Sequence, residues 1–158
     1  KNFDSCDIEQ QELYTRFEAE GSLIILESDY IRATDIIAYM KQFKTKTKAK
    51  FVKIGYDPSR YENLKAMIDL YFYDKDSEKQ VPIRQGFAMS DYIQIFKAQI
   101  EAGNLLHNQS LMEWSLMNVA VRIGTSGDLM LKKKSQDEKI DPVVASVMAM
   151  QVMVSDEL

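Results

Sequence analysis

One stretch decides the fold, residues 51–72, which reads FVKIGYDPSRYENLKAMIDLYF. Apolar side chains recur at every second position through its first six residues, and this period of two predicts a β-strand. Asp57-Pro58 predicts a turn, because proline disfavours the helical conformation in the residue before it. Ser59 then stands where a helix N-cap is expected, ahead of helical spacing over residues 60–71. A strand that passes into a helix through a short turn is typical of α/β proteins.

The flanking sequence alternates between the same two periods. Helical spacing predicts further helices at residues 8–20, 31–43, 90–102, about 110–117 and 141–154. Short apolar runs predict further strands at residues 23–26, 81–84, 119–123 and 129–131. The last two strands are expected to form a β-hairpin through the glycine-containing connection at 124–128. We therefore expect a single α/β domain over residues 1–158.

Composition narrows the class of protein. The 158 residues are 46% hydrophobic and 28% charged, which is typical of a soluble globular domain and excludes collagen-like, disordered and disulfide-stapled chains. No apolar run approaches the ~20 residues of a membrane span. The only cysteine, Cys6, cannot form an internal disulfide and indicates a reducing compartment. A net charge of −4 argues against a strongly basic protein that coats nucleic acid, but it permits local handling of DNA.

Two acidic residues are candidates for catalysis and metal binding. Asp57 follows a predicted strand, and Asp141 is expected to cap the last helix, with Pro142 at its first position. Strand ends in α/β sheets open toward a crevice where ligands bind. Carboxylates gathered there suit Mg²⁺ or Mn²⁺, which prefer oxygen ligands and can activate water for phosphodiester cleavage. The spacing alone favours the alternative that Asp57 is a turn residue and Asp141 a helix cap.

Basic residues near these two aspartates are candidates for DNA binding. Lys132, Lys133, Lys134 and Lys139 belong to a predicted charged loop, residues 132–139, just before the last helix. Contacts from such lysines to phosphate would position a DNA backbone without reading its bases. The alternative is a solvated surface loop.

Arg60 could contact phosphate in the same way, since it follows Asp57 by three residues.

Histidine-based chemistry and ATP hydrolysis find less support in the sequence. His107 is the only histidine, too few for a histidine-based zinc site or catalytic triad. The phosphate loop G-x-x-x-x-G-K-[ST] is absent from the sequence, so ATP hydrolysis by that route is not expected.

Several short motifs then occur in a fixed order. They are IGYDP at 54–58, VPIRQG at 81–86, MS at 89–90, IEAGNLLH at 100–107 with Trp114 and Asn118 after it, and KS at 134–135 followed by KID at 139–141. In this order and spacing, over about residues 10–154, the sequence resembles the nuclease domain of tailed-phage or prophage large terminase subunits. The resemblance implies an RNase H-like fold, a central mixed sheet flanked by helices. It also implies an endonuclease that cuts concatemeric DNA during packaging with two divalent ions, Mg²⁺ or Mn²⁺.

The resemblance also assigns roles and partners. By motif position, Asp57 matches the second acidic ligand of the family and Asp141 the last. The first ligand of the family lies on a strand upstream of the helix that matches residues 8–20, and this sequence begins after that strand. The resemblance thus implies the C-terminal nuclease portion of a larger subunit, lacking its first strands and weak or inactive alone.

The partners that the resemblance implies are double-stranded DNA, the terminase ATPase domain, the small terminase subunit and the capsid portal, in the cytoplasm of a bacterial host and without a membrane. A rival hypothesis from another class is a non-catalytic module that binds DNA or packaging partners. A third is an unrelated small α/β binding domain.

Overall fold

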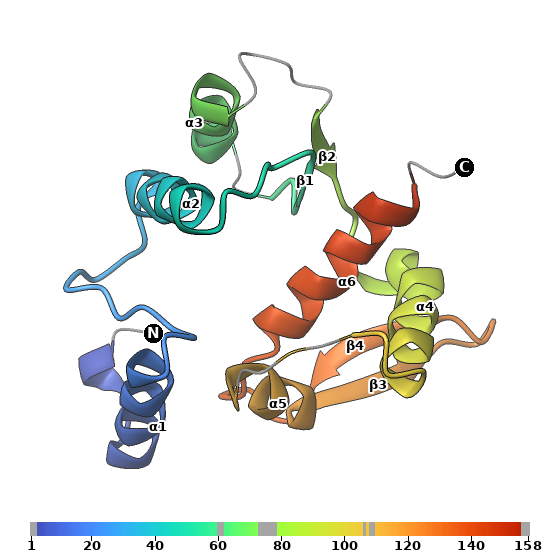
Figure 1. The fold of residues 1–158 in the computed structure, drawn as a ribbon. Helices are drawn as coiled ribbons and strands as arrows, with labels where there is room; N and C mark the ends of the chain where they lie inside the picture. Colours follow the sequence, from blue (N-terminus) through green and yellow to red (C-terminus); the bar gives the residue numbers. More distant parts are fainter. Residues whose placement is uncertain (1–2, 60–61, 73–78, 106, 108–109, 156–158) are drawn as a thin grey trace.

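The chain folds into helices and two small, separate β-sheets, as Figure 1 shows. A computed structural model describes residues 3–59, 62–72, 79–105, 107 and 110–155. The α-helices are α1 (Ile8–Ala19), α2 (Ala33–Thr47), α3 (Glu62–Phe72), α4 (Ser90–Glu101), α5 (Ser110–Met117) and α6 (Asp141–Val154), and short 3₁₀ turns span Phe3–Ser5 and Gly86–Met89. The strands are β1 (Ile54–Tyr56), β2 (Gln80–Pro82), β3 (Val119–Ile123) and β4 (Leu129–Lys133). None of these helices is long and apolar enough to cross a membrane.

The strands pair in two separate ladders. β1 and β2 are parallel, with Gly55 opposite Val81, whereas β3 and β4 form the expected antiparallel hairpin. Gly127 has a φ of +87° in the connecting turn, a conformation that glycine adopts without a steric penalty. The mixed α/β class is confirmed, and the described strands form two two-stranded sheets.

Several predicted segments differ from the structure. The helix predicted at 31–43 spans 33–47, and the strand predicted over 51–56 is shorter, at 54–56. Residues 23–26 form no strand among the described residues, because an apolar run becomes a strand only where a partner backbone lies beside it. The amide of Ile25 instead donates to the side chain of Glu18. The predicted loop at 132–139 begins two residues late, because Lys132 and Lys133 pair with β3 and continue β4.

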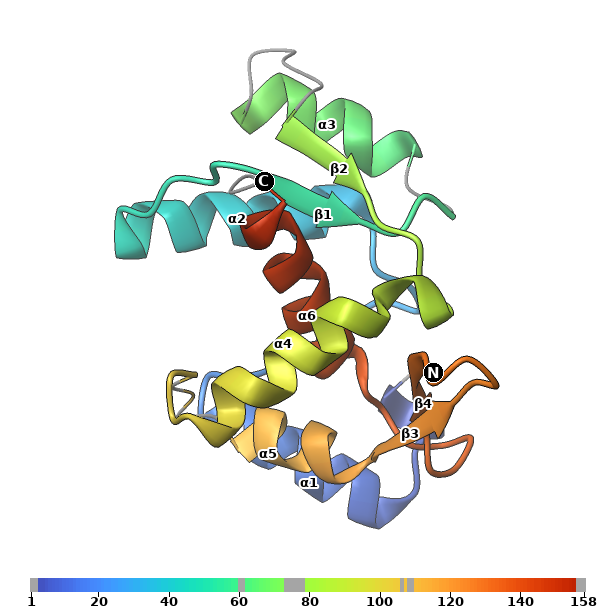
Figure 2. The same cartoon turned by 90° about the vertical axis from the view of Figure 1, so that its right-hand side faces the viewer.

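Helix α6 forms the centre of the larger core. It is apolar on most of its faces, and five of its residues are buried, namely Val143, Val147, Met148, Met150 and Val152. In Figure 1 and Figure 2 its C-terminal end approaches β1 and β2, whereas its N-terminal end lies by α5 and the hairpin. A smaller core joins α2 to α3 through Ile37 and Ile68. Asp57 follows the end of β1 and Asp141 begins α6, so both predicted aspartates are attached to elements that pack in these cores.

Candidate functional site

Asp57 lies at the end of β1, as predicted. Because β1 and β2 are parallel, the residues that follow both strands emerge at the same edge of the sheet. The amide of Ile83 donates to the carbonyl of Tyr56 at 2.8 Å and extends the pairing past β2. Two residues further on, the Gln85 side chain donates from Nε2 to Asp57 Oδ2 at 2.9 Å. The sheet therefore brings together an acid and an amide that lie 28 positions apart in the sequence.

The second oxygen of Asp57 is also hydrogen-bonded. Asp57 Oδ1 accepts from the Ser59 hydroxyl at 2.6 Å and from the Ser59 amide at 2.9 Å. The side-chain bond from Ser59 lowers the pKa of Asp57 most, its backbone bond lowers it further, and desolvation opposes both. The carboxylate of Asp57 is thus held in its charged form. Ser59 was expected to cap a helix at residues 60–71; the start of that helix and Arg60 lie outside the described residues.

We expect Ser59→Ala to raise the pKa of Asp57 toward its ordinary value of 3.8, because the strongest hydrogen bond to the carboxylate is lost. A lowered folded-state pKa stabilises the fold above the ordinary pKa, and this contribution is lost as the pH falls through the folded-state pKa. The free energy of unfolding of Ser59→Ala should therefore fall less steeply than that of the unmodified chain as the pH is lowered. Titration of the Asp57 carboxyl carbon by NMR measures the shift. Ser126→Ala, in the exposed hairpin turn, is the control, and an unchanged Asp57 pKa in Ser59→Ala would refute the assignment.

Asp141 lies in different surroundings. It is exposed and forms the first residue of α6, so the N-cap is Ile140, one position earlier than predicted. Together with Lys139 it lines a hollow of about 730 Å³ between α1, residues 23–31, α5 and the start of α6. Tyr14 and Trp114 line the same hollow, with their rings edge to face at 6.2 Å.

Tyr14 is a neutral neighbour of Asp141. Burial raises the pKa of the Tyr14 phenol, and the charges of Cys6, Asp7 and Asp141 raise it further. A raised pKa keeps the phenol protonated, and a protonated phenol is a hydrogen-bond donor. The hollow therefore combines a carboxylate, a lysine and a phenolic donor on an apolar, aromatic wall.

Asn118 forms hydrogen bonds with the backbone of two of the predicted DNA-binding lysines, Lys134 and Lys139. Asn118 is buried; its carbonyl accepts from the amide of Lys134 at 3.1 Å, and its side chain donates to the carbonyl of Lys139 at 3.2 Å. The ammonium of Lys134 donates to the carbonyl of Met117, whereas Lys132 and Lys133 are exposed on β4. Asn118 thereby ties the end of the hairpin to the segment that leads into Asp141.

The hydrogen-bond partners of the Asp57 carboxylate are Ser59 and Gln85, and Asp141 is not among them. Gly55 of β1 packs beside Met148 and Val152, and Met148 lies seven residues after Asp141 on α6. At a rise of 1.5 Å per residue, seven residues correspond to about 10 Å of helix. Among the described residues, no group of three or more His, Cys, Asp or Glu side chains is placed to hold a metal ion. The donor type suits Mg²⁺, which proteins often bind through one or two carboxylates while water and phosphate complete the shell.

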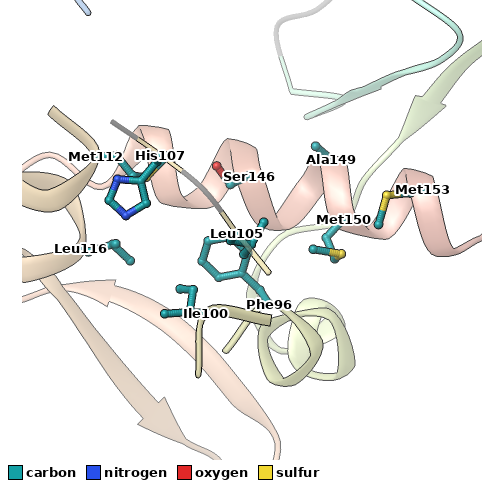
Figure 3. A pocket seen from close by; sticks show the side chains of 10 residues that line it. All are labelled: Phe96, Ile100, Leu105, His107, Met112, Leu116, Ser146, Ala149, Met150 and Met153. Carbon is teal, nitrogen blue, oxygen red and sulfur yellow. The ribbon is translucent and has the colours of Figure 1, made fainter. Parts of the chain in front are cut away.

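His107 belongs to a different part of the molecule. It lies on a cavity of about 340 Å³ between α4, α5 and α6, shown in Figure 3. Most of the other side chains around this cavity are apolar, among them Phe96, Leu105 and Met150. Such a lining suits packing or an apolar ligand rather than a charged substrate.

Four residues of the site were not predicted from the sequence. Gln85 lies within the VPIRQG motif, Asn118 and Trp114 belong to the ordered series of motifs, and Tyr14 falls in the predicted helix at residues 8–20. Their roles come from contacts between distant segments, such as the one between Gln85 and Asp57. Local periodicity carries no signal for such contacts.

Comparison with known proteins gives a consistent result. A family model described as "Terminase large subunit, endonuclease domain" matches residues 4–157. The terminase large subunits of Lactococcus phage p2 and Lactococcus phage SK1 are each 50% identical over 156 residues, which cover 99% of this chain and 29% of each relative. The chain thus spans about 29% of the length of these relatives. The crystal structure of the HK97 bacteriophage large terminase matches 91% of the chain and 30% of its own length, with a TM-score of 0.74 at 17% identity, and supports the RNase H-like fold class.

Proposed function

The chain belongs to the terminase large subunit endonuclease domain family, and on that basis we propose that it cuts concatemeric double-stranded DNA during phage genome packaging. The family match over residues 4–157 is the observation that carries this proposal. The proposed setting is the cytoplasm of the bacterial host. The proposed partners are the ATPase part of the same subunit, the small terminase subunit and the capsid portal.

Asp57 and Asp141 are the proposed catalytic residues and metal ligands. Asp57 is kept ionised by Ser59 and is oriented by Gln85, so it offers a charged oxygen ligand at the sheet edge. Asp141 offers a second carboxylate at the start of α6. A bound Mg²⁺ or Mn²⁺ would supply Lewis-acid activation of water and stabilise the leaving oxygen of the phosphodiester.

The basic residues would hold the substrate. We assign phosphate contacts to Lys132, Lys133, Lys134 and Lys139, and by sequence position also to Arg60. Exposed Lys132 and Lys133 project from a strand that the buried Asn118 connects to the segment before Asp141. These contacts would fix the register of the DNA backbone relative to the carboxylates.

We expect weak nuclease activity from the 158-residue chain alone. Its described residues include no group of three or more acidic, histidine or cysteine side chains placed to hold a metal ion. Further ligands would come from the rest of the large subunit or from substrate phosphates.

The test of the proposed function is cleavage of a supercoiled plasmid by the full-length large subunit. We expect linear and nicked products with Mn²⁺ and none with EDTA, because the metal is required to activate water. Equal cleavage with and without EDTA would refute metal dependence. Heat-inactivated protein with Mn²⁺ serves as the control for metal-catalysed DNA damage.

One observation favours the rival hypothesis of a non-catalytic module. Both oxygens of Asp57 already accept hydrogen bonds within the chain, so the carboxylate is satisfied without a metal. Calorimetric titration with Mn²⁺ distinguishes the two hypotheses. Heat of binding that disappears in Asp57→Asn supports a metal site. No measurable heat in either the unmodified protein or Asp57→Asn supports a non-catalytic module.

A further inference from the structure

A second concentration of positive charge lies far from the predicted lysine cluster in the sequence. Six lysines, at positions 41, 44, 46, 48, 50 and 53, fall between Asp35 and Asp57, and the intervening stretch contains no acidic residue. The chain as a whole carries a net charge of −4, so the positive charge of this stretch is opposite in sign to the net charge of the chain. Such local asymmetry in an acidic protein indicates a surface for an anionic partner.

The structure shapes part of this stretch into a defined turn. Helix α2 ends at Thr47, and Lys48 reverses the chain with a φ of 57°. The rings of Phe43 and Phe51 lie 6.1 Å apart and close the segment between them, residues 44–50, here called the cationic turn. The hydroxyl of Thr47 donates to the carbonyl of Phe43 at 2.8 Å and accepts from the amide of Ala49 at 3.2 Å. The turn is therefore ordered by its own contacts.

The turn is anchored to α3 by aromatic rings. Phe51 packs edge-on against Phe72, with ring centroids 5.3 Å apart. The ammonium of Lys44 lies 5.9 Å from the ring centroid of Phe72, and that of Lys41 lies 3.5 Å from the ring centroid of Tyr71. Cation–π contacts of this kind restrain an ammonium group and leave its charge uncancelled.

The charges on the turn are available to a partner. All four of its lysines, 44, 46, 48 and 50, are exposed. Within the part of the chain that the structure describes, the ion pairs involve other residues, such as the pairs of Lys65 with Asp69 and Lys97 with Glu101. Stabilisation of the C-terminal end of α2 explains lysines in the last helical turn, because cations there interact favourably with the helix dipole. It does not explain Lys48 and Lys50, which lie beyond the helix.

We propose that the cationic turn is a second contact for the phosphate backbone of double-stranded DNA, an inference that rests on the proposed function. In Figure 1 and Figure 2, α2 and the β3–β4 hairpin lie on opposite sides of α6. Lysines of the turn would therefore contact phosphates different from those held by Lys132 and Lys133. Lysine contacts to phosphate carry no base specificity, which suits a surface that guides DNA of any sequence.

The test compares two double variants of the 158-residue chain in EDTA, where no metal-dependent cleavage occurs. Lys46→Gln/Lys50→Gln removes two charges from the turn. Arg16→Gln/Lys97→Gln removes the same charge from exposed ion pairs on α1 and α4 and is the matched control. Binding of a fluorescent random-sequence duplex is measured by anisotropy over a range of salt concentrations, and circular dichroism verifies that each variant is folded.

Removal of two phosphate contacts should lower the magnitude of the slope of log K against log[salt] by about 1.8, which weakens binding roughly 60-fold near 0.1 M salt. The control should bind as the unmodified chain does. An unchanged slope in Lys46→Gln/Lys50→Gln, an equal loss in the control, or no duplex binding by the unmodified chain would overturn the inference. Since the assay contains no metal, its failure is distinguishable from failure of the nuclease proposal, which plasmid cleavage tests.

Discussion

Replacing Asp57 by asparagine in the full-length large subunit is expected to lower plasmid cleavage with Mn²⁺ by at least ~100-fold. Asparagine keeps the size of the side chain and one oxygen acceptor for Ser59, but it removes the negative charge that would bind a cation. Changes in residues that merely support a metal ligand cost about 10–100-fold in affinity or activity, and loss of a ligand itself should cost more. The measurement is the initial rate of supercoil loss at saturating Mn²⁺.

The same assay assigns the second carboxylate. Asp141→Ala should also reduce cleavage, and because Asp141 is exposed at a helix start, its removal should leave the fold intact. Asp91→Asn, in the first turn of α4, changes an acidic residue outside the proposed site and should cut normally. Undiminished cleavage by both Asp57→Asn and Asp141→Ala would eliminate the site assignment while leaving family membership untouched.

The sequence predicted those features that depend on neighbouring residues. The hairpin was predictable because alternation on both sides of 124–128 and a glycine turn are local signals. The end of β1 at Asp57-Pro58 was predictable because proline restricts the residue before it. Residues 23–26 have the composition of a strand, yet pairing depends on a partner backbone that no local pattern specifies.

The candidate site shows the same division. Asp57 and Asp141 were identified from their positions at a strand end and a helix start, and their roles in catalysis remain predictions. The distance between their carboxylates depends on how α6 crosses β1, and the α6 residues beside Gly55 of β1 are Met148 and Val152 rather than residues of its first turn. Gln85 could not be found from the sequence, because its contact with Asp57 joins segments that follow different strands. Long-range packing decides these contacts, so only the structure reveals them.

Strand β1, which precedes Asp57, packs closely against α6, which begins at Asp141, and Gly55 lies at this contact. Replacing Gly55 by valine should strongly destabilise the fold. A Cβ at this position would lie 2.8 Å from Cγ2 of Val152 and 3.2 Å from Cγ1 of Ile83, both of which are buried. It would also lie 3.5 Å from the carbonyl oxygen of Met148, a backbone atom that moves only with α6. Extra volume in a packed core typically costs 1–3 kcal/mol, and valine adds three carbons here. We expect a lower urea midpoint and a lower Tm for Gly55→Val.

The matched comparison is between two alanine variants. At Gly124 a Cβ would meet Cε1 of Phe87 at 3.1 Å, but Phe87 is 38% exposed and its ring can shift. Gly55→Ala should therefore lower stability clearly more than Gly124→Ala, although both create close contacts. Because Val152 is the nearest neighbour, Val152→Ala should partly rescue Gly55→Ala, giving a positive coupling in a double-mutant cycle. Equal stability of Gly55→Val and the unmodified chain would mean that β1 and α6 are not packed as described.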